Sequence, residues 1–143
     1  MTSPIAVVGA GLVGAGWAIV FARAGHDVRL YDGDEKIRAT ALDGIRANLE
    51  GLQSFDLIND AGAVADRIAV HGDLASAVAG VSYVQESVFE TIPVKQEVTQ
   101  QLDEACSSET VIGSSSSGIP ASAFTENLKG RSRCLIAHPV NPP

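Results

Sequence analysis

The sequence contains few of the residues that mark metal-binding, disulfide-rich or membrane proteins. Its 143 residues include two cysteines, Cys106 and Cys134, which have neither the spacing of a metal site nor the pattern of a disulfide framework. Two reduced thiols are typical of a cytoplasmic protein. No apolar run approaches the ~20 residues that span a bilayer, and residues 1–4 lack the basic region of a signal peptide. We therefore expect a cytoplasmic protein with no bound metal and no membrane segment.

Positive charge is also scarce. Ten lysines and arginines stand against 17 aspartates and glutamates, which gives a formal net charge of −7. Because no basic stripe is visible, nucleic acid and anionic membrane surfaces are disfavoured as partners. Hydrophobic residues make up 45% of the chain and charged residues 19%, which is typical of a folded globular protein. The length fits one domain, residues 1–143.

What the sequence does contain is a glycine-rich turn near its N-terminus. Residues 5–8, Ile-Ala-Val-Val, form an unbroken apolar run typical of a central parallel strand. Gly9, Gly11 and Gly14 follow with the spacing G-x-G-x-x-G. In a strand–turn–helix unit, the first glycine permits the tight turn and the second lets the backbone approach a pyrophosphate. The third lets the helix pack closely on the strand. The turn therefore predicts a dinucleotide site.

Two neighbouring features support this prediction. A helix is expected from Val13, so Leu12, Val13 and Gly14 lie at a helix N-terminus, where unpaired N–H groups and the helix dipole attract negative charge. Asp32 closes the next apolar segment, 18 residues beyond Gly14. This is near the ~20-residue spacing at which an acidic group binds the adenosine ribose. The alternative is a structural glycine turn with an incidental aspartate at the end of a strand.

Segments with the pattern of strands alternate with segments with the pattern of helices along the whole chain. The expected strands are residues 5–8, 28–31, 68–71, 83–86, 111–113 and 134–137. The expected helices are residues 13–24, 34–49, 74–78 and 91–105, with a short one near residue 120 and a helical extension within 51–67. Such alternation predicts an α/β fold, a doubly wound parallel sheet with strand order 3-2-1-4-5-6.

Polar residues close or follow four of the expected strands. Like Asp32, the residues Glu86, Ser114–Ser117 and His138 stand at strand ends, and the carboxyl ends of the strands border the ligand crevice of this fold. Imidazole is suited to take a proton from a hydroxyl while a hydride leaves its carbon. Simpler interpretations remain open. Glu86 would be a carboxylate in solvent, the serines a flexible loop, and His138 a residue that only hydrogen-bonds its own loop.

Four motifs in this order carry a family resemblance. They are residues 9–14 (GAGLVG), 84–90 (VQESVFE), 114–119 (SSSSGI) and 138–142 (HPVNP). Together they resemble the NAD-binding domain of the L-3-hydroxyacyl-CoA dehydrogenases, which is a Rossmann fold, and the resemblance covers essentially the whole chain. The serine run and the sequence AHPVNPP at 137–143 are more similar to the branch that contains L-gulonate 3-dehydrogenase and lambda-crystallin.

The resemblance implies a role for each matching residue. Asp32 would hold the adenosine ribose of NAD, Glu86 would lie near the nicotinamide and the catalytic histidine, and Lys95 would lie near the cofactor. The implied cofactor-binding set is Gly9, Gly11, Leu12, Val13, Gly14, Asp32, Glu86 and Lys95. In the implied catalytic set, His138 is the acid/base, Ser117 hydrogen-bonds the 3-oxygen of the substrate, and Asn141 supports the loop of His138.

The implied activity is oxidation of a 3-hydroxy group to a 3-keto group, with hydride transfer to NAD. Asp32 is followed by Asp34 and Glu35, where an arginine would suit the 2′-phosphate of NADP, so NAD is favoured. Family members that act on hydroxyacyl-CoA usually carry Asn-Thr-Ser-Ser where this chain has Ser-Ser-Ser-Gly at 115–118. They also carry Phe at the position of Val140. The resemblance implies a 3-hydroxyacyl-CoA dehydrogenase type of activity, and both departures shift weight towards the alternative, a free hydroxy acid such as L-gulonate. A non-catalytic, crystallin-like NAD-binding protein is the alternative of another class.

The end of the chain also bears on activity. In the family, the glutamate that pairs with the catalytic histidine follows it, and a helical second domain that makes most of the dimer contact comes later. This chain ends at Pro143. The resemblance therefore implies a truncated domain that binds NAD without turning over, and a homodimer when full length.

Overall fold

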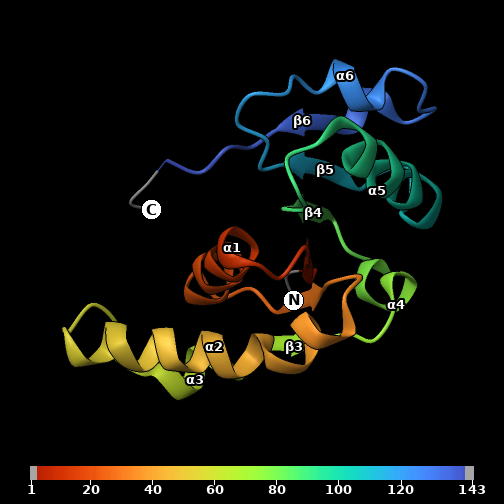
Figure 1. The fold of residues 1–143 in the computed structure, drawn as a ribbon. Helices are drawn as coiled ribbons and strands as arrows, with labels where there is room; N and C mark the ends of the chain where they lie inside the picture. The colour runs from red at the N-terminus through yellow and green to blue at the C-terminus, as the bar shows by residue number, and fades with distance from the viewer. Residues whose placement is uncertain (1–2, 141–143) are drawn as a thin grey trace.

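A computed structural model describes residues 3–140, which form a six-stranded sheet in the order β3-β2-β1-β4-β5-β6 (Figure 1). The strands are β1 (Ile5–Val8), β2 (Val28–Tyr31), β3 (Ile68–Val70), β4 (Tyr83–Glu86), β5 (Val111–Ser114) and β6 (Cys134–Ile136). All five neighbouring pairs are parallel. The predicted fold class and strand order are confirmed.

Helices connect the strands. They are α1 (Leu12–Arg23), α2 (Glu35–Ser54), α3 (Ala61–Ala65), α4 (Leu74–Val78), α5 (Ile92–Ala105), α6 (Ser122–Thr125) and the 3₁₀ helix η1 (Arg131–Arg133). The crossover after β2 differs from the expectation, because α2 runs on to Ser54 and α3 is a separate helix. Asp56 adopts a positive φ of 55° between them, and the Asp60 carboxylate caps α3 by accepting from the N–H of Ala63 at 2.9 Å.

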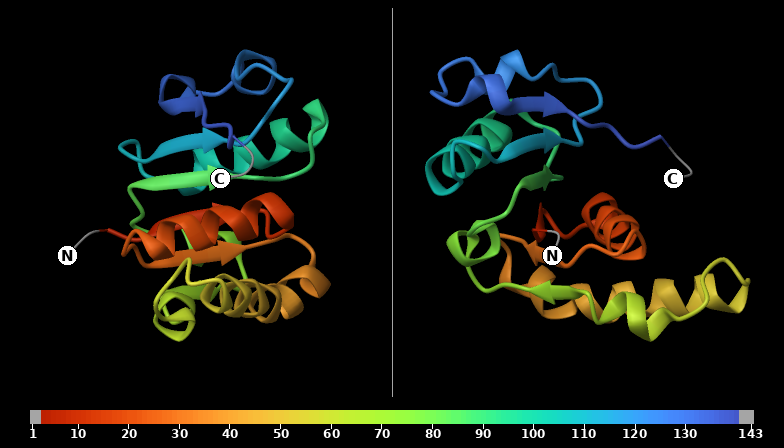
Figure 2. Two further views of the ribbon diagram at one scale, coloured as in Figure 1. Left: turned by 90° about the vertical axis from the view of Figure 1, so that its left-hand side faces the viewer. Right: turned by 180° about the vertical axis from the view of Figure 1, so that it is seen from behind.

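The helices form two layers with the sheet between them. One buried cluster joins α1, α2 and α3 to side chains such as Val7 and Leu30, and the other joins α4 and α5 to Val8 and Val84. Neighbouring residues of a strand therefore serve opposite layers, as the pleat requires. Figure 1 and both views of Figure 2 show α1 to α3 on one side and α4 and α5 on the other. The central strand β1 is buried on both faces along its whole length.

The end of α1 sets the direction of β2. Gly25 has a φ of +94°, its N–H donates to Ala22 O at 3.0 Å, and the N–H of His26 donates to Phe21 O at 3.1 Å. This is the Schellman arrangement that ends a helix at a glycine. The chain therefore enters β2 in the direction that brings Asp32 to the sheet edge where Gly9 lies.

None of the described helices has the length and apolar character that crossing a membrane would require.

Candidate cofactor and catalytic site

The glycine turn after β1 is packed so tightly that two of its glycines admit no side chain. Gly9 has a φ of +100°, and a Cβ placed there would lie 2.5 Å from Ser87 O. A Cβ on Gly14 would lie 1.7 Å from Gly9 O. Because real Cβ atoms do not approach backbone oxygens so closely, packing within the protein explains both glycines.

Gly11 has no such explanation within the protein. A Cβ there would meet no atom within 4 Å, and Gly11 is the N-cap of α1, where no side chain caps the helix and no acidic residue occupies the first turn. The side chain of Leu12 is 89% exposed. The N-terminus of α1 therefore presents uncapped N–H groups to open space, which fits the pyrophosphate of a dinucleotide.

Asp32 holds the glycine turn in place. Its Oδ2 accepts from the N–H of Ala10 at 2.8 Å, and its Oδ1 accepts from the N–H of Asp34 at 2.9 Å. The half-buried carboxylate thereby joins the end of β2 to the turn after β1. Each carboxylate oxygen can accept a further bond, so the ribose interaction predicted for Asp32 is compatible with this geometry.

An arginine that the sequence did not single out lies beside Asp32. Nη1 of Arg38 donates to Asp32 O at 2.7 Å and to Gly33 O at 3.3 Å. The guanidinium carbon lies 5.7 Å from the centre of the Tyr31 ring, a cation–π distance. Nη1 of Arg38 is therefore already hydrogen-bonded within the protein.

Glu86 and Lys95 form a buried ion pair. Their side chains are 0% and 1% exposed, and Lys95 Nζ lies 2.9 Å from Glu86 Oε1. Glu86 also accepts from the hydroxyl of Ser114 and from the N–H of Val88. The interpretation of Glu86 as a solvent-exposed carboxylate is therefore wrong, because α5 returns Lys95 beneath the end of β4. The cofactor roles implied for both residues stay predictions, and the inward-facing ammonium favours an indirect role for Lys95.

The serine loop after β5 is held by Glu90, a residue that sequence reasoning missed. Glu90 Oε1 accepts from the hydroxyl of Ser116 at 2.6 Å and from the N–H groups of Ser117 and Gly118 at 2.9 and 3.2 Å. Its Oε2 lies 3.5 Å from Lys95 Nζ. The serines are therefore not a fully solvated loop, because Ser114 and Ser116 are buried and Glu90 binds the loop.

The pKa of Glu90 reflects these contacts. Desolvation alone would raise it, but the hydrogen bonds from Ser116, Gly118 and Ser117, together with the charge of Lys95, lower it to about 2. Glu90 is the last residue of the 84–90 motif, but its role could not be predicted from the sequence, because the loop that it binds lies 26 to 28 residues away. Ser117 itself is exposed, as a residue that meets a substrate must be.

His138 is exposed and follows β6 at the same edge of the sheet. It shares a cleft of about 520 Å³ with Leu12 and Val13 of the glycine turn. The cleft is also lined by Gly16, Trp17, Val20, Asn48, Pro139 and Val140. Within residues 3–140 no hydrogen bond joins His138 to Ser117, and Asn141 lies outside the described residues. The structure thus brings His138 and the first residues of α1 to one cleft.

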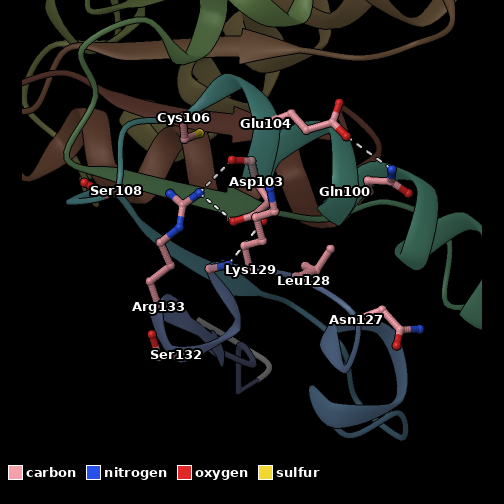
Figure 3. Close-up of a pocket in the computed structure, with 11 residues that line it drawn as sticks. Gln100, Asp103, Glu104, Cys106, Ser108, Asn127, Leu128, Lys129, Ser132 and Arg133 are labelled. Atoms are coloured by element: carbon pink, nitrogen blue, oxygen red, sulfur yellow. Dashed lines mark hydrogen bonds and ion pairs between the residues drawn. The ribbon is translucent and has the colours of Figure 1, made fainter.

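A larger cavity of about 830 Å³ lies at the opposite edge, where α5 ends and β5 and β6 begin. Figure 3 shows Arg133 pointing at Asp103 within it, with Nη2 and Oδ1 2.7 Å apart. Cys106 lies nearby, and burial raises the pKa of its thiol and of the Cys134 thiol. Because this fold binds ligands at the carboxyl ends of its strands, volume alone does not identify the site.

Comparison with known proteins also identifies an NAD-binding domain. The family described as "3-hydroxyacyl-CoA dehydrogenase, NAD binding domain" matches residues 4–143. The lambda-crystallin homolog of Rattus norvegicus is 37% identical over 150 residues, which cover 100% of this chain and 47% of that protein. An L-carnitine dehydrogenase of Streptomyces griseus is 37% identical over 97% of this chain and 41% of that protein.

Solved structures agree. A 3-hydroxybutyryl-CoA dehydrogenase from Escherichia coli superposes with a TM-score of 0.90 at 30% identity, covering 99% of this chain and 30% of the other. The chain spans less than half the length of the curated relatives described above. With a family match over nearly its whole length, this chain belongs to the NAD-binding domains of the 3-hydroxyacyl-CoA dehydrogenase family.

Proposed function

We propose that this chain provides the cofactor site and the acid/base of a dehydrogenase that oxidises a 3-hydroxy group to a 3-keto group. The observation that carries the proposal is the shared cleft, which joins Leu12 and Val13 at the uncapped end of α1 to His138. NAD, when bound, supplies the acceptor for the hydride. The chain's own residues bind the cofactor, orient the substrate and move the proton.

The contacts support a proposed role for each segment. The N–H groups at the start of α1 bind the pyrophosphate, with Gly11 leaving room for it. Asp32 accepts from the ribose while it holds the turn. Ser117, on a loop fixed by Glu90, donates to the substrate's 3-oxygen. His138 takes the hydroxyl proton.

The substrate class is the finer part of the proposal. The relatives include proteins named L-carnitine dehydrogenase and lambda-crystallin, and solved structures named 3-hydroxybutyryl-CoA dehydrogenase. Free 3-hydroxy acids, L-gulonate among them, and 3-hydroxyacyl-CoA thioesters therefore form the two arms of a substrate test. We also propose a cytoplasmic location and, in a form of the protein as long as its relatives, a homodimer.

Calorimetric titration of the chain with NAD, and with NADP in parallel, tests the cofactor half. We expect binding of NAD in preference to NADP. Gly11→Ala is the informative variant, because its added methyl meets only open space in the protein and obstructs only a ligand. We expect it to weaken NAD binding by roughly tenfold or more, a loss of at least ~1.4 kcal/mol.

Gly44→Ala is the matched control, since a Cβ there also meets no atom within 4 Å but Gly44 lies within α2. Asp32→Ala is less informative, because it also releases the N–H groups of Ala10 and Asp34. Equal NAD binding by wild type and Gly11→Ala would contradict the assignment of the pyrophosphate site.

Fusing the chain to the remaining part of the S. griseus relative tests the chemistry, with cofactor reduction followed for both substrate arms. His138→Gln should abolish reduction while leaving NAD binding intact. NAD binding without turnover on either arm would favour the alternative of a non-catalytic, crystallin-like protein.

A further inference from the structure

We propose that Gln85 is a positioning residue that sets the backbone at His138 and the serine loop together, an inference that rests on the proposed function of His138 and Ser117. Gln85 lies on β4 and is fully buried. Its Nε2 donates to Ala137 O at 3.1 Å and to Ser115 Oγ at 2.7 Å. One amide nitrogen thus holds the residue before His138 and the second residue before Ser117.

The orientation of this amide is determined by its neighbours. Ala137 O can only accept, so the nitrogen of the amide must face it. On the other side Oε1 of Gln85 accepts from the Tyr83 hydroxyl at 2.6 Å. Burial raises the pKa of Tyr83, so the phenol keeps its proton at neutral pH. All polar groups of the Gln85 side chain are therefore satisfied in a single arrangement.

Ser115 extends the network in a defined direction. Its hydroxyl oxygen receives N–H bonds from Gln85 and, at 3.0 Å, from Nε1 of Trp17 on α1. Trp17 Nε1 and Gln85 Nε2 can only donate, so each of them uses one lone pair of the Ser115 oxygen. The Ser115 proton must then be donated to Ser87 Oγ, 2.7 Å away. The positions of the protons on Tyr83, Gln85 and Ser115 are therefore determined.

Ser87 connects the network to the glycine turn. Its carbonyl oxygen is the atom that leaves no room for a Cβ on Gly9, and its N–H donates to Val8 O at 2.7 Å. The network therefore joins the serine loop to the segment that carries His138, while Ser87 borders the pyrophosphate turn through backbone contacts that do not involve Gln85. A buried amide is costly unless every group is paired, and here both bonds from Nε2 end in segments that carry a proposed functional residue.

Gly113 leaves the space that the Tyr83 side chain of this network occupies. A Cβ on Gly113 would lie 2.0 Å from the Tyr83 hydroxyl and 3.1 Å from the Cβ of Ala137. Gly113 on β5 therefore makes room for the Tyr83 ring, which meets the Phe21 ring edge-on at 6.0 Å. The phenol is held in position to donate to Gln85.

The experiment compares backbone amide signals of ¹⁵N-labelled chain in wild type and Gln85→Glu at each of several pH values. The introduced carboxylate keeps the shape but loses both N–H donors, and it repels Ala137 O. At neutral pH we expect shifted signals at Ala137, His138 and Ser115–Ser117. Burial raises the pKa of the introduced carboxyl, so acidification should restore part of the pattern as it regains a proton to donate.

Two further variants make the test specific. Ser115→Ala removes only one arm, so it should shift the serine loop and leave Ala137 and His138 in place. Gln96→Glu is the matched control, because Gln96 also donates its amide to a backbone carbonyl, that of Ala123, at 3.2 Å. We expect it to leave both segments unchanged.

Unchanged signals at Ala137 and His138 in Gln85→Glu would overturn the proposal, and so would changes that spread to His71 at the end of β3. This readout needs no turnover, so it is independent of whether the proposed dehydrogenase activity is found. In an active fusion protein, Gln85→Glu should lower kcat by up to ~10²-fold with an unchanged KM for NAD. Activity should partly recover on acidification, relative to wild type at the same pH.

Discussion

Helix α5 carries one ion pair in its first turn and another in its last turn, and the two pairs lie in different surroundings. In its first turn Lys95 pairs with Glu86 at 2.9 Å, and in its last turn Asp103 pairs with Arg133 at 2.7 Å. The first pair is fully buried at the carboxyl edge of the sheet. The second is 11–12% exposed at the amino edge. The two pairs are similar in chemistry, so the difference lies in what surrounds them.

At the amino edge, both terminal nitrogens of the Arg133 guanidinium are paired within the protein, and only its buried Nε has no hydrogen-bond partner among the described residues. Arg133 donates to the carbonyl oxygens of Asp103, Ser107 and Thr110, and a Cβ on Gly130 would lie 2.1 Å from Asp103 Oδ1. At the carboxyl edge, Gly11 faces open space and α1 begins without a cap. At this protein's amino edge, the ion pair beside the larger cavity is explained by contacts within the protein, whereas the uncapped N–H groups at the start of α1 are not.

Lys95→Met breaks the carboxyl-edge pair and should have the largest effect. It leaves the Glu86 carboxylate buried without a cation, which should lower the free energy of unfolding by about 3–5 kcal/mol. Chemical denaturation measures this. Lys129→Met, at an exposed lysine, is the control and should change stability little. A Lys95→Met protein as stable as wild type would show that the pair is not the anchor of this edge.

Gly130→Ala at the amino edge and Gly11→Ala at the carboxyl edge should have opposite effects: the first should change stability and the second should change NAD binding. Gly130→Ala forces Asp103 and the Arg133 Nε to move, so stability should fall by about 1–3 kcal/mol with NAD affinity unchanged. Gly11→Ala should lower stability by less than ~1 kcal/mol and weaken NAD binding. Denaturation and calorimetry on the same two variants give all four values. The contrast fails if Gly130→Ala also weakens NAD binding.

The smallest expected effect is on the pH dependence of stability, which should depend on the hydrogen bonds between Glu90 and the serine loop. The pKa of Glu90 falls from 4.5 to about 2 on folding, so its contribution is fully present above pH 4.5 and is lost as the pH drops towards 2. Because the side chain is 43% exposed, water screens the effect and it should be modest. Glu90→Gln should flatten this part of the stability curve, measured by denaturation at successive pH values.

Glu50→Gln supplies the reference for that measurement, since Glu50 is an exposed residue of α2. Parallel curves for wild type and Glu90→Gln between pH 4.5 and 2 would show that the serine loop does not depend on the ionised carboxylate.

Local patterns in the sequence were sufficient for the fold and for one part of the site. The apolar run before Gly9, the glycine spacing and the alternation of strand and helix patterns predicted the sheet and its strand order correctly. These signals are local because a strand, a turn and a helix N-terminus each depend on neighbouring residues. The extent of α2 and the existence of α3 were missed, because a positive φ at Asp56 and a cap at Asp60 leave only weak traces in the sequence.

Only the tertiary structure decided which polar side chains meet. Lys95 and Glu86 are nine residues apart, Glu90 reaches a loop 26 to 28 residues away, and Gln85 reaches Ala137 across 52 residues. Parallel crossovers bring distant strand ends to one edge, and strand neighbours then determine whether a carboxylate is buried beside an ammonium or left in water. The sequence by itself therefore determined where the ligand edge lies, and the packing of β4, β5 and α5 determined how its side chains are held.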